Sequence, residues 1–168
     1  MPALTRPAAR SQIGGHRAGR GGNGRTQDRS DSRIEDRLLI REVYGRYAMA
    51  VVRQDGADWL DCWSADATWK TPQFEVAGHA ALEQMWTATW TDFRSVTPFN
   101  EIGPIAFTQD GASVLSTVLE TIALKSGSGM TMTGLYTDRL VREGGEWRFT
   151  YRAYTPIGQP ASLAGRAA

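Results

Sequence analysis

Two tyrosines at helical spacing are the first side chains whose chemistry stands out. Tyr44 and Tyr47 are three positions apart in a segment whose apolar residues recur every three or four positions. Both phenols should therefore lie on one face of a helix. A phenol can donate a hydrogen bond to a carbonyl or enolate oxygen and so stabilise the charge that develops there. The alternative is that each buried hydroxyl only satisfies a neighbouring backbone group.

Glu120 is the second candidate, because it is the one carboxylate inside the most apolar segment of the chain. It alternates with Val118 and Ile122, and a buried carboxylate is costly unless it is paired or its pKa is raised. A carboxylate with a raised pKa is suited to moving a proton, so we predict Glu120 as the general base. The alternatives are an ion pair with Arg148 or Arg152 on a neighbouring strand, or a position facing away from the core.

Aromatic side chains are abundant enough to line a pocket. The chain has six Trp, five Tyr and five Phe in 168 residues. Such rings fill a core more often than they bind a ligand, but this many Trp in a small domain favours an apolar cavity that some of them line. The rings that we expect to contact its occupant are Trp63, Trp69, Trp86 and Phe99.

The histidines and the cysteine argue against several kinds of site. Cys62 is the only cysteine, so neither an intramolecular disulfide nor a cysteine-based zinc site can form. The two histidines, His16 and His79, are far apart, and no group of residues has metal-ligand spacing. We therefore expect no metal and no cofactor.

Charge is unevenly distributed along the chain. The net charge is +1, and residues 1–33 contain seven Arg and two Asp, which is +5, so the remainder carries 1 − 5 = −4. The basic segment has no aromatic residue for base stacking, and we expect no nucleic-acid partner. No apolar run is long enough to span a bilayer, so we expect no membrane contact and a cytoplasmic location.

Composition divides the chain into three parts. Residues 1–31 are rich in Gly, Arg, Ser and Ala and have no helical or strand periodicity, so we expect a disordered tail. Ser32 and Glu35 form a capping box that predicts a helix start. Residues 32–157 should be one α+β domain, and residues 158–168 a flexible C-terminal tail.

Within the domain, the pattern of apolar residues predicts helices first and strands afterwards. The first helix should run from Ser32 to Gly56, a short second helix should be capped by Asp58, and a third should cover residues 78–93. Short strands are expected at 67–69 and 74–76. Turns at 109–111, 126–129 and 144–145 then divide the remainder into a four-stranded meander.

Residues 114–124 are apolar on both faces of the predicted strand, which is typical of a strand covered on both sides. We expect helices on one face and a second copy of the chain on the other, which makes the protein a homodimer. On the next strand, Asp138 and Arg139 are expected to alternate outward as structural residues.

The order of these elements resembles that of the nuclear-transport-factor-two-like superfamily, and several short segments are similar to its SnoaL-like branch. The resemblance implies a conical α+β barrel, with three N-terminal helices packed on a curved, mainly antiparallel sheet that ends in a four-stranded meander. The segments that carry it are Tyr44 with Tyr47-Ala48, Asp58-Trp59, Trp63 to Ala67, Gly78 to Leu82, Tyr136 to Val141 and Glu146 to Phe149.

The resemblance also implies where related enzymes place their catalytic groups. Dehydratases of this superfamily use an Asp–His pair, whose places fall on Val52 and about Phe99, and neither side chain can move a proton. In the isomerases, Tyr47 matches the oxyanion-binding tyrosine, and the general-base Asp would fall near Thr71. Tyr136 lies near the strand position that carries a second hydrogen-bond donor in these enzymes.

We therefore predict a cofactor-independent lyase, isomerase or cyclase that acts by acid–base chemistry on a hydrophobic, oxygenated small molecule such as a polyketide, steroid or terpenoid. The alternative is a non-catalytic small-molecule-binding or partner-subunit protein, since the usual Asp–His pair is missing. The predicted catalytic residues are Tyr44, Tyr47, Glu120 and Tyr136, and the predicted substrate-binding residues are Trp63, Trp69, Trp86, Phe99, Asn100 and Arg152.

Overall fold

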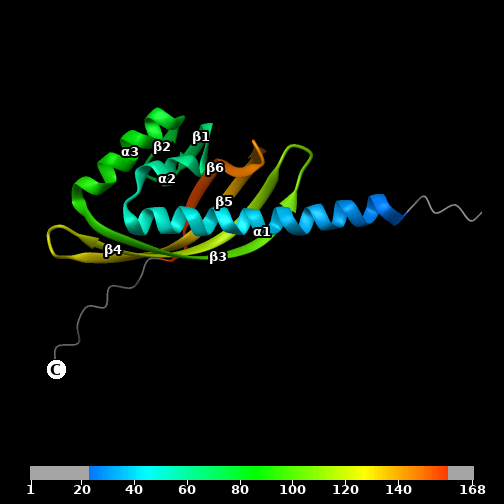
Figure 1. Ribbon diagram of the computed structural model, residues 1–168. Coiled ribbons are helices and arrows are strands. Elements are labelled where there is room, and N and C mark those ends of the chain that lie inside the picture. Colours follow the sequence, from blue (N-terminus) through cyan, green and yellow to red (C-terminus); the bar gives the residue numbers. More distant parts are fainter. Residues whose placement is uncertain (1–22, 159–168) are drawn as a thin grey trace, which may run out of the picture.

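The computed structural model describes residues 23–158 of the chain. These residues form three helices on one side of a six-stranded sheet (Figure 1). The helices are α1 (Asn23–Arg53), α2 (Gly56–Asp61) and α3 (His79–Asp92). The strands are β1 (Trp63–Lys70), β2 (Glu75–Ala77), β3 (Phe93–Phe107), β4 (Ala112–Leu124), β5 (Gly129–Glu143) and β6 (Glu146–Pro156).

The sheet has the strand order β2-β1-β6-β5-β4-β3. Neighbouring strands are antiparallel except β1 and β6, which run parallel. The long strands β3 and β4 curve, and α1 runs along them (Figure 1). Helices α2 and α3 lie near β1 and β2. The predicted α+β cone and its four-stranded meander are confirmed.

Helix α1 begins at Asn23, so the predicted start at Ser32 is wrong, and residues 23–31 form helical turns where we expected a disordered tail. The predicted tail segments 1–22 and 159–168 lie outside the described residues. Towards its C-terminus, α1 buries an apolar stripe against the sheet, as its spacing predicted. The members of this stripe are Ile40, Val43, Tyr44, Tyr47, Ala50 and Val51.

The connection from α1 to α2 differs from the prediction. Gln54, rather than Gly56, leaves the helical conformation, with a φ of 58°. Asp55 then caps α2 by accepting a hydrogen bond from the backbone N–H of Asp58 at 3.1 Å. Asp58, predicted as the cap, lies in the first turn of α2, where its carboxylate pairs with Arg53 at 2.8 Å. A carboxylate is favourable there because the first turn exposes backbone N–H groups.

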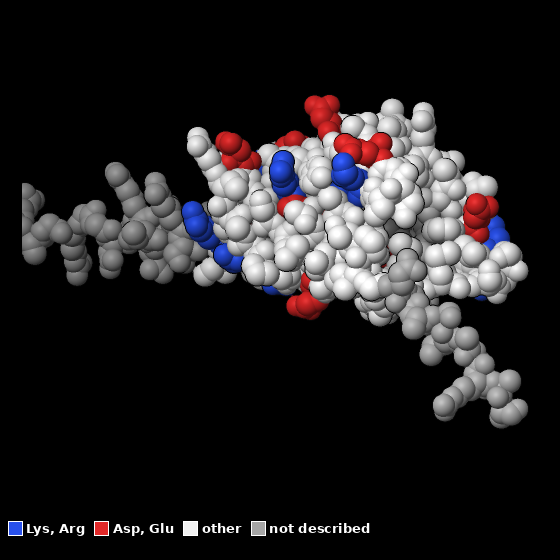
Figure 2. Space-filling view, turned by 180° about the vertical axis from the view of Figure 1, so that it is seen from behind, with Lys and Arg blue, Asp and Glu red and all other residues white. Residues whose placement is uncertain are grey.

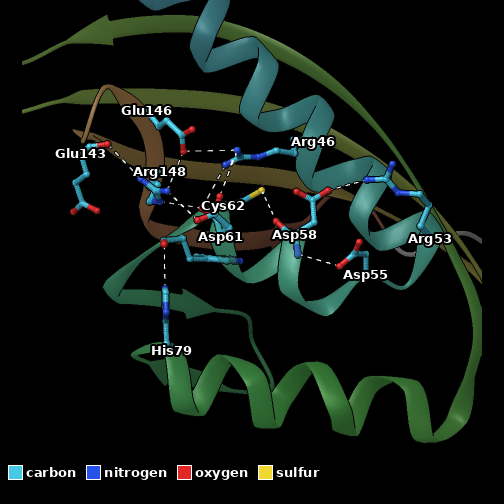
Figure 3. Close-up of polar contacts among 11 residues, drawn as sticks. Arg46, Arg53, Asp55, Asp58, Asp61, Cys62, His79, Glu143, Glu146 and Arg148 are labelled. Carbon is cyan, nitrogen blue, oxygen red and sulfur yellow. Dashed lines mark hydrogen bonds and ion pairs between the residues drawn. The ribbon is translucent and has the colours of Figure 1, made fainter.

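An ion-pair network on the outer side of the molecule joins α1, α2 and β6 (Figure 3). Arg148 on β6 lies 2.9 Å from both Asp61 and Glu146, and Arg46 on α1 lies 3.5 Å from the same Asp61. The groups are partly exposed, so solvent screens them and each pair adds little stability. The network therefore links the helices to β6 at the surface and lies apart from the buried interior.

None of the helices within residues 23–158 is long and apolar enough to cross a membrane.

Candidate functional site

A cavity of about 210 Å³ lies between the helices and the inner face of the sheet. Residues from α1, α2, α3, β1 and the meander strands line it, so every layer of the fold contributes. The lining includes Tyr47, Val51, Trp59, Trp69, Phe74, Trp86, Trp90, Glu120, Ile122, Met132, Tyr136 and Tyr154. Its surface is predominantly apolar, as is usual for a site that binds small organic molecules.

Indole rings form one wall of the cavity. Trp59 and Trp86 are stacked with their ring centroids 4.8 Å apart. Trp90 meets Trp86 edge to face at 5.2 Å, and Trp69 meets Trp59 in the same manner at 5.8 Å. Rings that brace one another lose little freedom when a ligand binds, so this wall is suited to hold a flat apolar molecule.

The register of β4 and β5 determines how far apart Tyr136 and Glu120 lie in the cavity. Tyr136 is paired with Ser116, and Glu120 with Met132, two rows further along the sheet. Between them lies the small pair Val118 and Gly134. Four residues along a strand span about 13 Å, so Tyr136 and Glu120 line the cavity from well-separated positions along the sheet, and the ring of Tyr154 covers Gly134 between them.

Glu120 faces this cavity, and neither structural alternative for it holds. Arg148 pairs with Asp61 and Glu146, and Arg152 pairs with Asp138, so no ion pair with Glu120 forms among the described residues. Burial raises the pKa of Glu120, and the charge of Arg152 opposes that rise. The carboxylate therefore meets the physical requirement for a proton acceptor in an apolar site.

Two phenols share the cavity with that carboxylate. Burial raises the pKa of Tyr47 to about 12, although Arg152 acts in the opposite direction. Burial also raises the pKa of Tyr136 well above its ordinary value. Both phenols therefore keep their protons at neutral pH and can act as hydrogen-bond donors. Tyr154 also lines the cavity, but its hydroxyl donates to the backbone oxygen of Thr133 at 2.9 Å.

Tyr44 does not line the cavity and belongs instead to a buried polar cluster behind it. Its hydroxyl donates a hydrogen bond to the carboxylate of Asp138, which also accepts one from Arg152 Nε at 3.0 Å. Asp138 and Arg152 are both 0% exposed. The prediction that Asp138 alternates outward is therefore wrong, because β5 turns the same face inward at Tyr136 and Asp138.

The predicted substrate-binding residues divide into three groups. Trp69 and Trp86 line the cavity, whereas Trp63 is fully buried in the core and Arg152 lies beneath the phenol rings.

Phe99 and Asn100 do not reach the cavity, and both border a shallow groove outside it. Phe99 pairs with Leu119 on the outer face of the sheet, and its ring is 61% exposed.

Several cavity residues were missed from the sequence. Trp59 lies in α2 and Trp90 in α3, each among apolar residues that recur at helical spacing. This pattern does not distinguish an indole that lines a cavity from one that packs in the core. Tyr154 pairs with Tyr136 across β5 and β6. The two-glycine turn at 144–145 by itself would pair Tyr136 with Ala153, and a shift in register between Arg139 and Leu140 brings Tyr154 opposite Tyr136 instead. No sequence signal marks that shift, so Tyr154 could not be placed from the turn.

His79, the histidine among residues 23–158, does not line the cavity. His79 Nε2 lies 3.1 Å from the backbone oxygen of Trp63 at the start of α3 (Figure 3). Val52, where the resemblance puts a catalytic Asp, is 43% exposed and points away from the cavity lining. Among the described residues that line the cavity, Glu120 is therefore the one carboxylate.

The fold and its cavity define a conical α+β pocket protein of the nuclear-transport-factor-two-like kind. Residues 32–153 match the SnoaL-like domain, and the chain belongs to this family. No curated protein matches the chain in sequence.

Solved structures share the fold. A presumed scytalone dehydratase from Novosphingobium aromaticivorans is 21% identical with a TM-score of 0.72, over 77% of this chain and 89% of that one. A hexachlorocyclohexane dehydrochlorinase from Novosphingobium barchaimii is 18% identical with a TM-score of 0.65, over 75% and 92% of the two chains. A ketosteroid isomerase-like protein from Erwinia carotovora is 18% identical with a TM-score of 0.63, over 73% and 96%. At these identities the likeness concerns the fold alone.

Proposed function

We propose that the protein is a cofactor-independent lyase, isomerase or cyclase that acts on a hydrophobic, oxygenated small molecule of the polyketide, steroid or terpenoid class. One observation carries the proposal: the Glu120 carboxylate, unpaired by any described cation, shares an aromatic cavity with the phenols of Tyr47 and Tyr136. A base at one end and hydrogen-bond donors at the other are the two elements that enolisation requires.

The chemistry would begin at a carbon next to a carbonyl group. The Glu120 carboxylate takes a proton from that carbon, and the C–H electron pair moves into the carbon–carbon bond of an enolate. The carbonyl oxygen gains the negative charge and accepts hydrogen bonds from Tyr47 and Tyr136. An isomerase or cyclase returns the proton from Glu120 to a different atom. A lyase expels a leaving group from the next carbon, and that group takes the proton.

The size of the cavity narrows the proposed substrates. Pockets that enclose drug-sized molecules measure roughly 300–1,000 Å³, and this cavity measures about 210 Å³. Within the proposed classes, the smaller members, with about two fused rings, fit best. The indoles of Trp59 and Trp86 offer such rings a flat surface.

Carbon-acid exchange tests this proposal without knowledge of the natural substrate. β-Tetralone, a two-ring ketone, is incubated in D₂O with the protein, and loss of the C–H signals next to its carbonyl is followed by NMR. The wild-type protein should accelerate the exchange, and Glu120→Gln should reduce the acceleration by at least about 100-fold, since positioned acid–base catalysis contributes that much. Glu101→Gln is the matched control, because Glu101 is exposed and lies outside the cavity.

The second candidate function is ligand binding without turnover, and the missing Asp–His pair favours it. In that case β-tetralone quenches the fluorescence of the cavity tryptophans, but its C–H bonds exchange no faster than in buffer. Exchange that is equally fast with Glu120→Gln would remove Glu120 from the mechanism.

We also propose that two copies of the chain associate through the outer face of the sheet. Phe99, Leu115 and Leu119 are exposed there, at 61%, 45% and 41%. Figure 2 shows, on the side turned away from the view of Figure 1, a broad surface with few charged side chains. Exposed apolar surface of this kind marks interaction sites, and the matching face of a second copy would cover it.

A further inference from the structure

The buried Arg152 guanidinium lies directly behind the two phenols of the cavity. Its Cζ atom is 4.1 Å from the ring centroid of Tyr136 and 4.5 Å from that of Tyr47. Phe149 is 4.4 Å away on another side. A cation held against aromatic faces is attracted by their electron density. One ring layer therefore separates a fixed positive charge from the interior of the cavity.

One hydrogen bond anchors this cation. Arg152 Nε donates to Asp138 at 3.0 Å, whereas Arg152 Nη1 is buried with no hydrogen-bond partner among the described residues. The second anchor is indirect, because the Tyr44 hydroxyl donates to the same Asp138 carboxylate. A buried guanidinium that uses so few of its five N–H groups is expensive for the fold. Burial disfavours the charged form, but Asp138 together with the phenols of Tyr47, Tyr136 and Tyr44 more than offsets this and keeps the pKa of Arg152 above its ordinary value.

The charged groups around the cavity come from three strands. Arg152 on β6 is positive, and Asp138 on β5 and Glu120 on β4 are the acidic groups. The remaining titratable side chains that face them are the neutral phenols Tyr44, Tyr47, Tyr136 and Tyr154. Arg152 is the one group of this set whose charge opposes the rise in the pKa of Tyr47, Tyr136 and Glu120. Its field therefore favours negative charge in the cavity.

We propose that Asp138 and Arg152 are positioning residues for this cavity: Asp138 holds the Arg152 guanidinium against the rings of Tyr47 and Tyr136, and the pair sets how strongly the cavity favours an oxyanion. The site then takes a phenolic or enolic oxygen at its Tyr47–Tyr136 end and tunes its ionisation. This inference rests on the proposed function, because it concerns the same cavity. It adds to the site two positioning residues that contact no substrate.

The two residues have opposite charges, and this separates positioning from mere structural support. If the pair only stabilises the fold, loss of either member should weaken ligand binding in the same direction. If the pair sets the electrostatic potential, removal of Asp138 leaves the cation unopposed and makes a bound phenol more acidic. Removal of Arg152 leaves the carboxylate unopposed and makes the same phenol less acidic.

The probe is para-nitrophenol, whose phenolate absorbs visible light and whose phenol form does not. Its absorbance is titrated against pH with the protein in excess, which gives the apparent pKa of the bound phenol. At about 8–10 Å and an effective dielectric constant of about 20, one unit charge shifts this pKa by about one pH unit. We expect Asp138→Asn to lower the apparent pKa by about that amount and Arg152→Met to raise it equally.

Three further variants make the test complete. Arg152→Lys retains the charge and should restore much of what Arg152→Met loses. The double variant Asp138→Asn with Arg152→Met removes both charges and should return the bound phenol close to its wild-type pKa, even where a single variant folds poorly. Arg139→Met is the matched control, since Arg139 is the exposed neighbour of Asp138 on β5 and should change nothing.

Shifts in the same direction for Asp138→Asn and Arg152→Met overturn the proposal, and so does the absence of any shift. Failure of the wild-type protein to bind para-nitrophenol at millimolar concentration overturns it as well, because the proposed oxyanion site would then have no affinity for a phenolic oxygen. The comparison of β-tetralone exchange between the wild-type protein and Glu120→Gln tests the base, whereas the para-nitrophenol titration tests the pair. Opposed shifts without exchange would refute the proposed catalysis alone, and exchange without opposed shifts would refute this inference alone.

Discussion

Replacing Glu120 by Gln should stabilise the fold above neutral pH and change it little in acid. Burial raises the pKa of Glu120 in the folded protein, so folding favours the protonated carboxyl group. The native carboxyl contributes its full share of stability below the pKa of the unfolded chain, and that share is lost as pH rises through the folded pKa. Gln has no charge to desolvate, so the variant escapes this loss.

The magnitude follows from the linkage between pKa and stability. Each unit by which folding raises the pKa corresponds to about 1.4 kcal/mol of stability that the wild-type protein lacks when Glu120 is ionised. In a chain of this length, about 1 kcal/mol shifts the melting temperature by about 2–4 °C. We therefore expect Glu120→Gln to melt several degrees above the wild-type protein at pH 8 and within about one degree of it at pH 4.

Thermal melts followed by circular dichroism at several pH values between 4 and 8 measure this difference. Glu101→Gln is again the control, because Glu101 is exposed and lies outside the cavity. A Glu120→Gln variant that melts below the wild-type protein at pH 8 would mean that the carboxylate has a stabilising partner. A difference that does not vary with pH would mean that Glu120 is not desolvated, and the case for a base would fail.

Three other substitutions test separate parts of the structure. Gly134→Ala should destabilise the fold by about 1–3 kcal/mol in chemical denaturation, because a Cβ atom there would overlap the ring of Tyr154; an unchanged midpoint would contradict the packing described. Tyr136→Phe should leave the melting temperature within a few degrees but weaken para-nitrophenol binding about tenfold, consistent with one lost hydrogen bond; equal affinity would exclude its hydroxyl from the site. Leu119→Lys should shift the mass in sedimentation from dimer to monomer without loss of helical signal, whereas a monomeric wild-type protein would contradict the proposed association.

The sequence was sufficient to predict the meander, because its turns have local causes. Gly144 and Gly145 adopt φ values of 60° and 93°, which side-chain-bearing residues avoid, and they join β5 to β6. The start of α1 was not predictable in the same way. Residues 23–31 have no apolar stripe, and a helix that continues without one leaves no periodic signal in the sequence.

The errors at the site come from the alternation of side chains along a strand, and two of them were avoidable. Tyr136 and Asp138 are two residues apart, so a strand that turns Tyr136 inward must turn Asp138 inward as well. An acidic residue was assumed to face water, and that assumption overrode the geometry. The error at Phe99 is the opposite one. A large aromatic ring was expected to face the cavity, but Phe99 pairs with Leu119, whose side chain faces outward.

The sequence could not predict which buried polar groups pair with one another. The sequence allowed Arg152 to pair with Glu120, and in the folded chain it pairs with Asp138 instead, because those two residues are opposite each other in the register of β5 and β6. That pairing leaves Glu120 as a desolvated carboxylate without a described cation.

Stability alone gives no reason for the arrangement, since apolar residues can replace a buried ion pair at no cost or even with a gain. A bound molecule that gives Glu120 a proton or a hydrogen bond would offset the cost of its desolvation, so a side chain that is unfavourable for the fold is also well placed to act on a ligand.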